Sequence, residues 1–284
     1  MSGMQATKMV VLDFSGTLSL EAALYARERN LIRELKLSGL WQMGVNGVAI
    51  FWDQIVDPTW QEGSTTAKGY KRCMFERVTQ IAGSSGDRPS EDEIWASVSR
   101  FVDSYFHHSL VDPEWGGVLR DLLARPEVMI VVATDHYAEA SGHILSQLQS
   151  LGVNGAPALR AEGTRRVLVA NSADLGHHKA SKSFWQVVKK AQGVEALSQV
   201  VIVDDFGFNE QPLDTYAEQK KIRERLSKTV ELLSTVFDAH TSAFPFFIRG
   251  EARGALPDRC QFVRAYRDLI RRAGRFASTV LARD

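Results

Sequence analysis

The chain has 284 residues, enough for one large α/β domain with an insertion or for two small domains. Its 34 basic and 34 acidic residues cancel, so no overall field favours nucleic acid or an anionic membrane as a partner. We expect a cytoplasmic protein, because no stretch reaches the ~20 apolar residues of a membrane helix and the start lacks a signal-peptide layout. The two cysteines, Cys73 and Cys260, are far apart and indicate neither disulfides nor a metal site.

Residues 9 to 19 begin as an apolar run that ends in a carboxylate, Asp13. A buried parallel strand accepts a charge at its carboxyl end chiefly in the crevice where open α/β sheets bind ligands. The following turn offers two short hydroxyls, exposed amides and close backbone access to an anion, from Ser15, Gly16 and Thr17. The segment therefore predicts a phosphate site with Asp13 as a potential nucleophile. Taken alone, it is equally consistent with a capped turn that opens a helix at Leu20.

More than a hundred residues separate this strand from the next one, far more than a simple crossover requires. Amphipathic patterns predict three helices there, over residues 20 to 37, 66 to 82 and 90 to 108. The third opens with Ser90 and Glu93, a capping-box arrangement, and residues 84 to 89 have the composition of a loop. We predict a helical subdomain over residues 19–111, inserted into an α/β core formed by residues 1–18 and 112–284.

Three later apolar segments also end in polar side chains. The strand at residues 128 to 134 ends in Thr134, and Asp135 and His136 follow it. The strand at residues 166 to 170 leads through a turn to Lys179. The strand at residues 200 to 205 ends in the pair Asp204 and Asp205, with Asn209 four residues beyond the second. In chain order, the strand ends supply a carboxylate, a hydroxyl, a lysine and an acidic pair.

The end of the chain predicts a long charged helix over residues 216 to 237, a last strand near residues 244 to 248, and a closing helix over residues 258 to 281. Two interpretations of the charged helix stay open. It is either a solvated helix stabilised by charge pairs or a helix that forms a homodimer.

The four ordered segments, Asp13 to Thr17, Thr134, Lys179, and Asp204-Asp205 with Asn209, resemble the motifs of the haloacid dehalogenase-like hydrolase superfamily. The resemblance spans residues 9 to 209. It implies an α/β fold with a Rossmann-like parallel sheet. It also implies a mobile cap that closes over the active site and selects a small phosphorylated substrate. The usual chemistry of the superfamily is a magnesium-dependent phosphoryl transfer through an aspartate nucleophile.

The resemblance also implies a role for each matching residue. Asp13 would attack phosphorus to form an aspartyl-phosphate, with Lys179 and Thr134 supplying a positive charge and a hydrogen bond. Magnesium would be held by Asp13, by the main-chain carbonyl of Ser15 and by Asp205, with Asp204 as a further ligand or an outer partner and Asn209 orienting the site. The expected substrate-binding residues are Ser15, Gly16, Thr17, Thr134 and Asp135.

Ser15 departs from the superfamily pattern. Phosphatases of this superfamily usually carry a second aspartate at that position, which protonates the leaving group and later activates water. A serine cannot perform either step at neutral pH, and such help is typically worth ~10²–10⁴ in rate. Three readings therefore stay open: a phosphohydrolase or phosphotransferase, a dehalogenase-like or phosphonatase-like hydrolase with the same nucleophile, and a catalytically weakened binding or regulatory protein.

Overall fold

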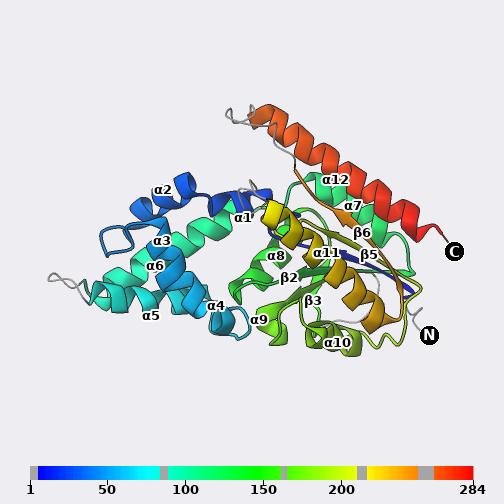
Figure 1. Cartoon of the computed structure of the whole chain (residues 1–284), viewed down its shortest axis with the longest axis horizontal. Coiled ribbons are helices and arrows are strands. Elements are labelled where there is room, and N and C mark those ends of the chain that lie inside the picture. The colour runs from blue at the N-terminus through cyan, green and yellow to red at the C-terminus, as the bar shows by residue number, and fades with distance from the viewer. Residues whose placement is uncertain (1–5, 84–88, 161–164, 210–215, 249–258, 284) are drawn as a thin grey trace.

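The computed structural model describes residues 6–83, 89–160, 165–209, 216–248 and 259–283, whose core is a six-stranded sheet (Figure 1). The strand order is β3-β4-β2-β1-β5-β6, and every neighbouring pair is parallel. The strands are β1 (Lys8–Leu12), β2 (Val128–Thr134), β3 (Gly155–Pro157), β4 (Val167–Asn171), β5 (Gln199–Asp204) and β6 (His240–Pro245). The predicted α/β fold with a Rossmann-like parallel sheet is confirmed.

The register of the three central strands brings the polar strand ends together. Leu12 pairs with Val132 of β2 and with Val203 of β5. Asp13 lies one residue beyond both pairs, and its backbone N–H donates to the Val203 carbonyl at 3.0 Å. Because the chain order of the strands reverses around β1, this edge of the sheet is where open α/β folds bind their ligands.

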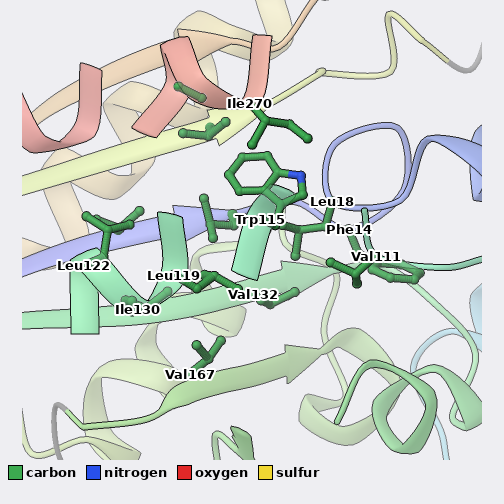
Figure 2. Packing of buried hydrophobic residues seen from close by; sticks show 14 of the residues in the cluster. Phe14, Leu18, Val111, Trp115, Leu119, Leu122, Ile130, Val132, Val167 and Ile270 are labelled. Atoms are coloured by element: carbon green, nitrogen blue, oxygen red, sulfur yellow. The ribbon is translucent and has the colours of Figure 1, made fainter. Parts of the chain in front are cut away.

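Helices cover both faces of the sheet. One face is covered by α7 (Glu114–Leu123), α8 (Glu139–Ser150) and α12 (Arg259–Leu281), and the other by α10 (Lys182–Ala191) and α11 (Tyr216–Phe237). Successive strand residues alternate between the two cores, with Val10 and Leu12 in one and Val11 in the other. Figure 2 shows the first core, where Trp115 and Leu119 of α7 pack near β1 and β2.

The chain between β1 and α7 forms a separate helical group beside the sheet (Figure 1). It consists of α1 (Leu20–Tyr25), α2 (Glu28–Ser38), α3 (Val48–Ile50), a π-helical stretch (Phe51–Val56), α4 (Asp57–Gly63), α5 (Tyr70–Ala82) and α6 (Glu91–His108). These elements bury an apolar cluster of their own, which includes Leu31, Phe51, Val78 and Phe101. We refer to residues 20–108 as the helical insertion.

The boundaries inside the helical insertion differ in part from those predicted. The helix predicted over residues 20 to 37 is two helices, because Arg27 between them adopts an extended conformation, with φ −66° and ψ 141°. The helix predicted from residue 66 begins at Tyr70, because Gly69 before it has φ +82°. The capping box of Ser90 and Glu93 is present at the start of α6. Of the predicted loop at residues 84 to 89, residues 84–88 lie outside the described part of the chain.

The C-terminal elements follow the prediction except for the last strand, which is β6 and begins at His240 rather than near residue 244. The buried side chains of α11, among them Ile222, Leu233 and Phe237, pack into the second core rather than facing outward. Cys73 is buried without a disulfide, and the side chain of Cys260 lies outside the described part. Within the described ranges, no helix combines the length and the hydrophobicity needed to cross a bilayer.

Candidate active site

Three buried carboxylates meet at the ends of β1 and β5. Asp13, Asp204 and Asp205 are 5%, 4% and 2% exposed, and each offers an oxygen that lies within 4.8 Å of the others. The chain arrives at this point because β1 ends one residue before Asp13 while its neighbour β5 ends at Asp204. Each ionised carboxylate in such a close and buried group disfavours ionisation of the others, and a nearby cation favours their charged forms.

Within the described ranges, the side chain of Lys179 forms ion pairs with this cluster. Its Nζ lies 2.5 Å from Asp13 Oδ1 and 3.0 Å from Asp204 Oδ2. Its backbone is held on both sides, because its N–H donates to Asp135 Oδ1 at 2.7 Å and its carbonyl accepts from Trp185 Nε1 at 2.8 Å. A lysine with a tethered backbone keeps its ammonium directed at the carboxylates.

The turn after Asp13 packs directly against Asp205. Gly16 has φ +77°, and a Cβ at this position would lie 2.9 Å from the Asp205 carboxyl carbon, so any larger residue would strain the backbone and displace Asp205. The Thr17 hydroxyl accepts the Asp205 backbone N–H at 3.2 Å. Ser15 forms a bridge with Ser19 within the same turn. Gly16 and Thr17, two of the residues predicted to bind an anion, thus lie directly against Asp205.

Asn209 joins the turn to the loop that follows β5. Its Nδ2 donates to the Gly16 carbonyl at 2.7 Å and to the Phe246 carbonyl at 2.8 Å. Its backbone N–H donates to Asp205 Oδ2, while Gly207 N–H donates to Oδ1, both at 2.8 Å. Asn209 therefore orients Asp205 and the Asp13 turn together, although its side chain lies outside the carboxylate cluster itself.

The remaining predicted residues lie at the end of β2 and just beyond it. Thr134 is the last residue of β2 and is 2% exposed. The Asp135 carboxylate accepts the Lys179 backbone N–H, so this side chain contacts the lysine loop. Burial raises the pKa of Asp135, and the positive charge of Lys179 opposes the rise. The structure thus brings Thr134 and Asp135 to the same edge of the sheet as Asp13.

The charged groups of the cluster shift one another's pKa values. Burial raises the pKa of the Asp13 carboxyl well above its usual range; Lys179 opposes this, and the charges of Asp204 and Asp205 add to it. Burial by itself would lower the pKa of Lys179, yet Asp13 and Asp204 outweigh it and hold the pKa well above its usual value. In the described part of the chain, the Lys179 ammonium pairs with two of the three carboxylates, those of Asp13 and Asp204. Their oxygens suit a hard divalent cation such as Mg²⁺, which binds few protein carboxylates and keeps several waters.

His136 does not have a nitrogen free for proton transfer. Its Nδ1 accepts the Tyr137 backbone N–H at 2.8 Å, so Nε2 carries the ring proton and donates to the Tyr105 hydroxyl at 2.7 Å. Burial lowers the pKa of His136 to about 4, and nearby His143 contributes to the lowering. The ring is therefore neutral at pH 7 and joins the core to α6 of the helical insertion.

Two more contacts connect the helical insertion to the loops around the site. Ser64 Oγ lies 2.7 Å from His178 Nε2, next to Lys179 in sequence, and the Trp60 indole stacks on the same imidazole with a 14° angle between planes. The Glu139 carboxylate accepts the Tyr70 N–H at 2.7 Å and so caps α5 from the core. Sequence patterns could not reveal these pairs, because their members are far apart in the chain and none lies in a recognisable motif.

Comparisons with known proteins give little beyond the fold. No family model matches the chain, and no curated protein matches it significantly. A 2-haloacid dehalogenase from Pseudomonas syringae pv. Tomato DC3000 is similar over 90% of this chain and 91% of its own, with 17% identity and a TM-score of 0.48. The HAD-hydrolase YfnB from Bacillus subtilis, bound to magnesium, is similar over 71% of this chain and 79% of its own, with 13% identity and a TM-score of 0.40. Both names belong to the superfamily that the four sequence segments resemble, but values this low support no statement about activity.

Proposed function

We propose that this chain is a hydrolase of the haloacid dehalogenase-like type, a magnesium-dependent phosphohydrolase or phosphotransferase that uses Asp13 as its nucleophile. One observation carries the proposal. Asp13, Asp204 and Asp205 present oxygens within 4.8 Å of one another, and Lys179 lies between the first two. A nucleophilic carboxylate, a fixed ammonium and additional acidic oxygens are the components that phosphoryl transfer through an aspartyl-phosphate requires.

In the proposed reaction, an Asp13 carboxylate oxygen attacks phosphorus while the bond from phosphorus to the leaving oxygen breaks. Lys179 remains bound to Oδ1 and attracts the phosphoryl oxygens, so the repulsion between the carboxylate and the phosphate falls. Thr134, at the end of the adjacent strand, would donate a hydrogen bond to one of those oxygens. Attack of water on the aspartyl-phosphate then regenerates Asp13 and releases phosphate.

Asp13, Asp205 and the Ser15 carbonyl would hold Mg²⁺, and Asp204 would serve as a further ligand or an outer partner. When bound, Mg²⁺ would neutralise the cluster and polarise the phosphoryl group. The donor set fits, because clustered carboxylate oxygens and a main-chain carbonyl are the hard oxygen ligands that Mg²⁺ binds.

Ser15 restricts the proposed substrates to those with a good leaving group or with a proton of their own to donate. His136 does not replace the missing acid, since both of its nitrogens are engaged and its pKa is about 4. The preferred substrate is therefore a small phosphorylated metabolite whose leaving oxygen needs little protonation.

The alternative hydrolases with the same nucleophile are less well supported. Phosphonate cleavage in this superfamily needs a lysine from the cap to form a Schiff base. The three lysines of the helical insertion are engaged elsewhere: Lys68 pairs with Glu62 and Glu76, Lys71 pairs with Asp103, and Lys36 lies over the Trp41 ring. Dehalogenation in this superfamily needs no metal, so it would give no role to the additional carboxylates of Asp204 and Asp205.

The experiment that tests the proposal is Mg²⁺-dependent capture of beryllium fluoride, which mimics the phosphoryl group on an aspartate. We expect a rise in melting temperature of the parent protein only when Mg²⁺ and beryllium fluoride are both present, and no rise for Asp13→Asn. A response equal in the two proteins, or independent of Mg²⁺, would overturn the proposed nucleophile. A screen of phosphorylated metabolites with and without Mg²⁺ then identifies the substrate.

A further inference from the structure

The turn after Asp13 is hydrogen-bonded by a residue of the C-terminal helix. Tyr266 of α12 places its hydroxyl 2.8 Å from the Thr17 carbonyl and 3.0 Å from the Leu18 carbonyl, although 249 residues separate Tyr266 from Thr17. The ring is 4% exposed and lies in the first core. A hydroxyl proton shared between two successive carbonyls fixes the direction in which the chain leaves the turn.

Tyr266 belongs to an aromatic trio with Trp115 of α7 and Phe246, which follows β6. The Phe246 ring lies 5.7 Å from Tyr266, nearly perpendicular to it, and 5.8 Å from Trp115. The indole Nε1 of Trp115 also donates to the Thr17 carbonyl, at 3.3 Å. Figure 2 shows the Trp115 indole between Ile270 of α12 and Leu18.

The trio reaches the carboxylate cluster by two routes. The first is the turn itself, because the Thr17 hydroxyl accepts the Asp205 backbone N–H. The second is the Phe246 carbonyl, which accepts from Asn209 Nδ2, the same group that binds the Gly16 carbonyl. Asp205 is thus oriented by Thr17 and by Asn209. Each of these two residues is hydrogen-bonded to a member of the aromatic trio.

We infer that Tyr266 is a positioning residue for the active site, acting through the Thr17 and Leu18 carbonyls on the geometry of Asp13 and Asp205. The inference rests on the proposed function only for its effect on turnover. Its effect on the order of the turn does not depend on any reaction. The role is distinct from that of a packing residue, because it depends on the hydroxyl group rather than on the ring.

The test uses Tyr266→Phe, which keeps the ring and removes the hydroxyl. The variant should fold, because the Thr17 carbonyl still accepts from Trp115 and the Leu18 carbonyl still accepts from the Asp112 backbone N–H at 3.2 Å. The matched control is Tyr25→Phe, since Tyr25 is also buried and also donates to a backbone carbonyl, that of Phe101 at 3.3 Å.

The first measurement is hydrogen–deuterium exchange, which needs no substrate. We expect amides of residues 15–19 and 205–209 to exchange faster in Tyr266→Phe than in the parent, and to be unchanged in Tyr25→Phe. The second measurement is hydrolysis of para-nitrophenyl phosphate with Mg²⁺. We expect kcat to fall about tenfold in Tyr266→Phe, while KM stays within about twofold of the parent value. This is the size of effect expected when one hydrogen bond that stabilises the transition state is lost.

Unchanged exchange at both segments would overturn the inference. A fall in kcat no larger than that of Tyr25→Phe, at equal melting temperature, would also overturn it, because the hydroxyl would then have only a structural role. If exchange accelerates as expected but the parent shows no Mg²⁺-dependent hydrolysis and no capture of beryllium fluoride, the proposed function fails and the positioning of the turn stands.

Discussion

Lys179 Nζ lies 2.5 Å from Asp13 Oδ1, and it lies 3.0 Å from Asp204 Oδ2 as well. The two carboxylates come from adjacent strands, so one ammonium bridges the ends of β1 and β5. Burial raises the pKa of Asp13 well above its usual value, and the attraction of Lys179 opposes that rise, so this contact favours the charged form of the carboxylate.

Asp13→Asn should abolish turnover and leave the fold intact. The amide is nearly isosteric with the carboxylate, but it is neither a nucleophile nor a good metal ligand. Steady-state rates on the best substrate, with circular dichroism and melting temperature as the control for folding, check the prediction. Activity above a small fraction of the parent's would remove Asp13 from the nucleophile role.

Asp205→Ala should raise the Mg²⁺ concentration needed for half-maximal activity by more than about tenfold, and by more than Asp204→Ala does. The backbone N–H groups of Gly207 and Asn209 hold the Asp205 carboxylate against the Asp13 turn, whereas Lys179 pairs with one Asp204 oxygen. Activity measured against Mg²⁺ concentration in both variants decides the order. Equal effects, or activity that persists in a chelator, would favour a dehalogenase-like reaction.

Ser15→Asp should speed hydrolysis of phosphomonoesters with poor leaving groups by about 10²-fold, and should have less effect on activated aryl phosphates. A carboxylic acid near the bridging oxygen helps only as far as charge builds up on that oxygen in the transition state. The variant should also release phosphate from the covalent intermediate faster, because the carboxylate can act as base toward water.

Rates of both substrate classes on parent and Ser15→Asp provide the check. An unchanged ratio of the two rates would mean that another group already serves as the acid. Asp135 is then the residue to test, because burial raises its pKa and its carboxylate contacts the lysine loop. Asp135→Asn is the suitable variant, since its amide oxygen can still accept the Lys179 N–H.

Acidification should destabilise the protein through His136. Its pKa is about 4 in the folded protein and 6.5 in the absence of burial, so the unfolded state binds the proton more tightly. The contribution of neutral His136 to stability is complete above pH 6.5 and is lost as the pH falls from 6.5 toward 4. The difference between the two pKa values corresponds to about 3 kcal/mol.

Urea unfolding of the parent and of His136→Asn across this pH range measures the effect. The free energy of unfolding should depend less steeply on pH in the variant, even though the variant is less stable at pH 7. His143 also has a pKa lowered by burial, so part of the slope should remain. Parallel curves for the two proteins would contradict a neutral, buried His136.

The sequence by itself determined the elements that depend on local patterns. Apolar runs predicted β1, β2 and β5, and the polar residue at the end of each run identified Asp13, Thr134 and the Asp204–Asp205 pair. These predictions succeed because the edge of a parallel sheet collects the residues that follow its strands, whatever the rest of the chain does. The roles of these residues remain predictions until the variants are measured.

Only the tertiary structure decided which distant groups support those residues. Tyr266 reaches Thr17 across 249 residues and Ser64 reaches His178 across 114 residues, and no local pattern specifies the direction of either side chain. The break between α1 and α2 at Arg27 is of the same kind, because the amphipathic pattern continues through it while the packing does not. Local periodicity records which face of a segment is buried, whereas the partner buried against it is chosen by the packing of the whole chain.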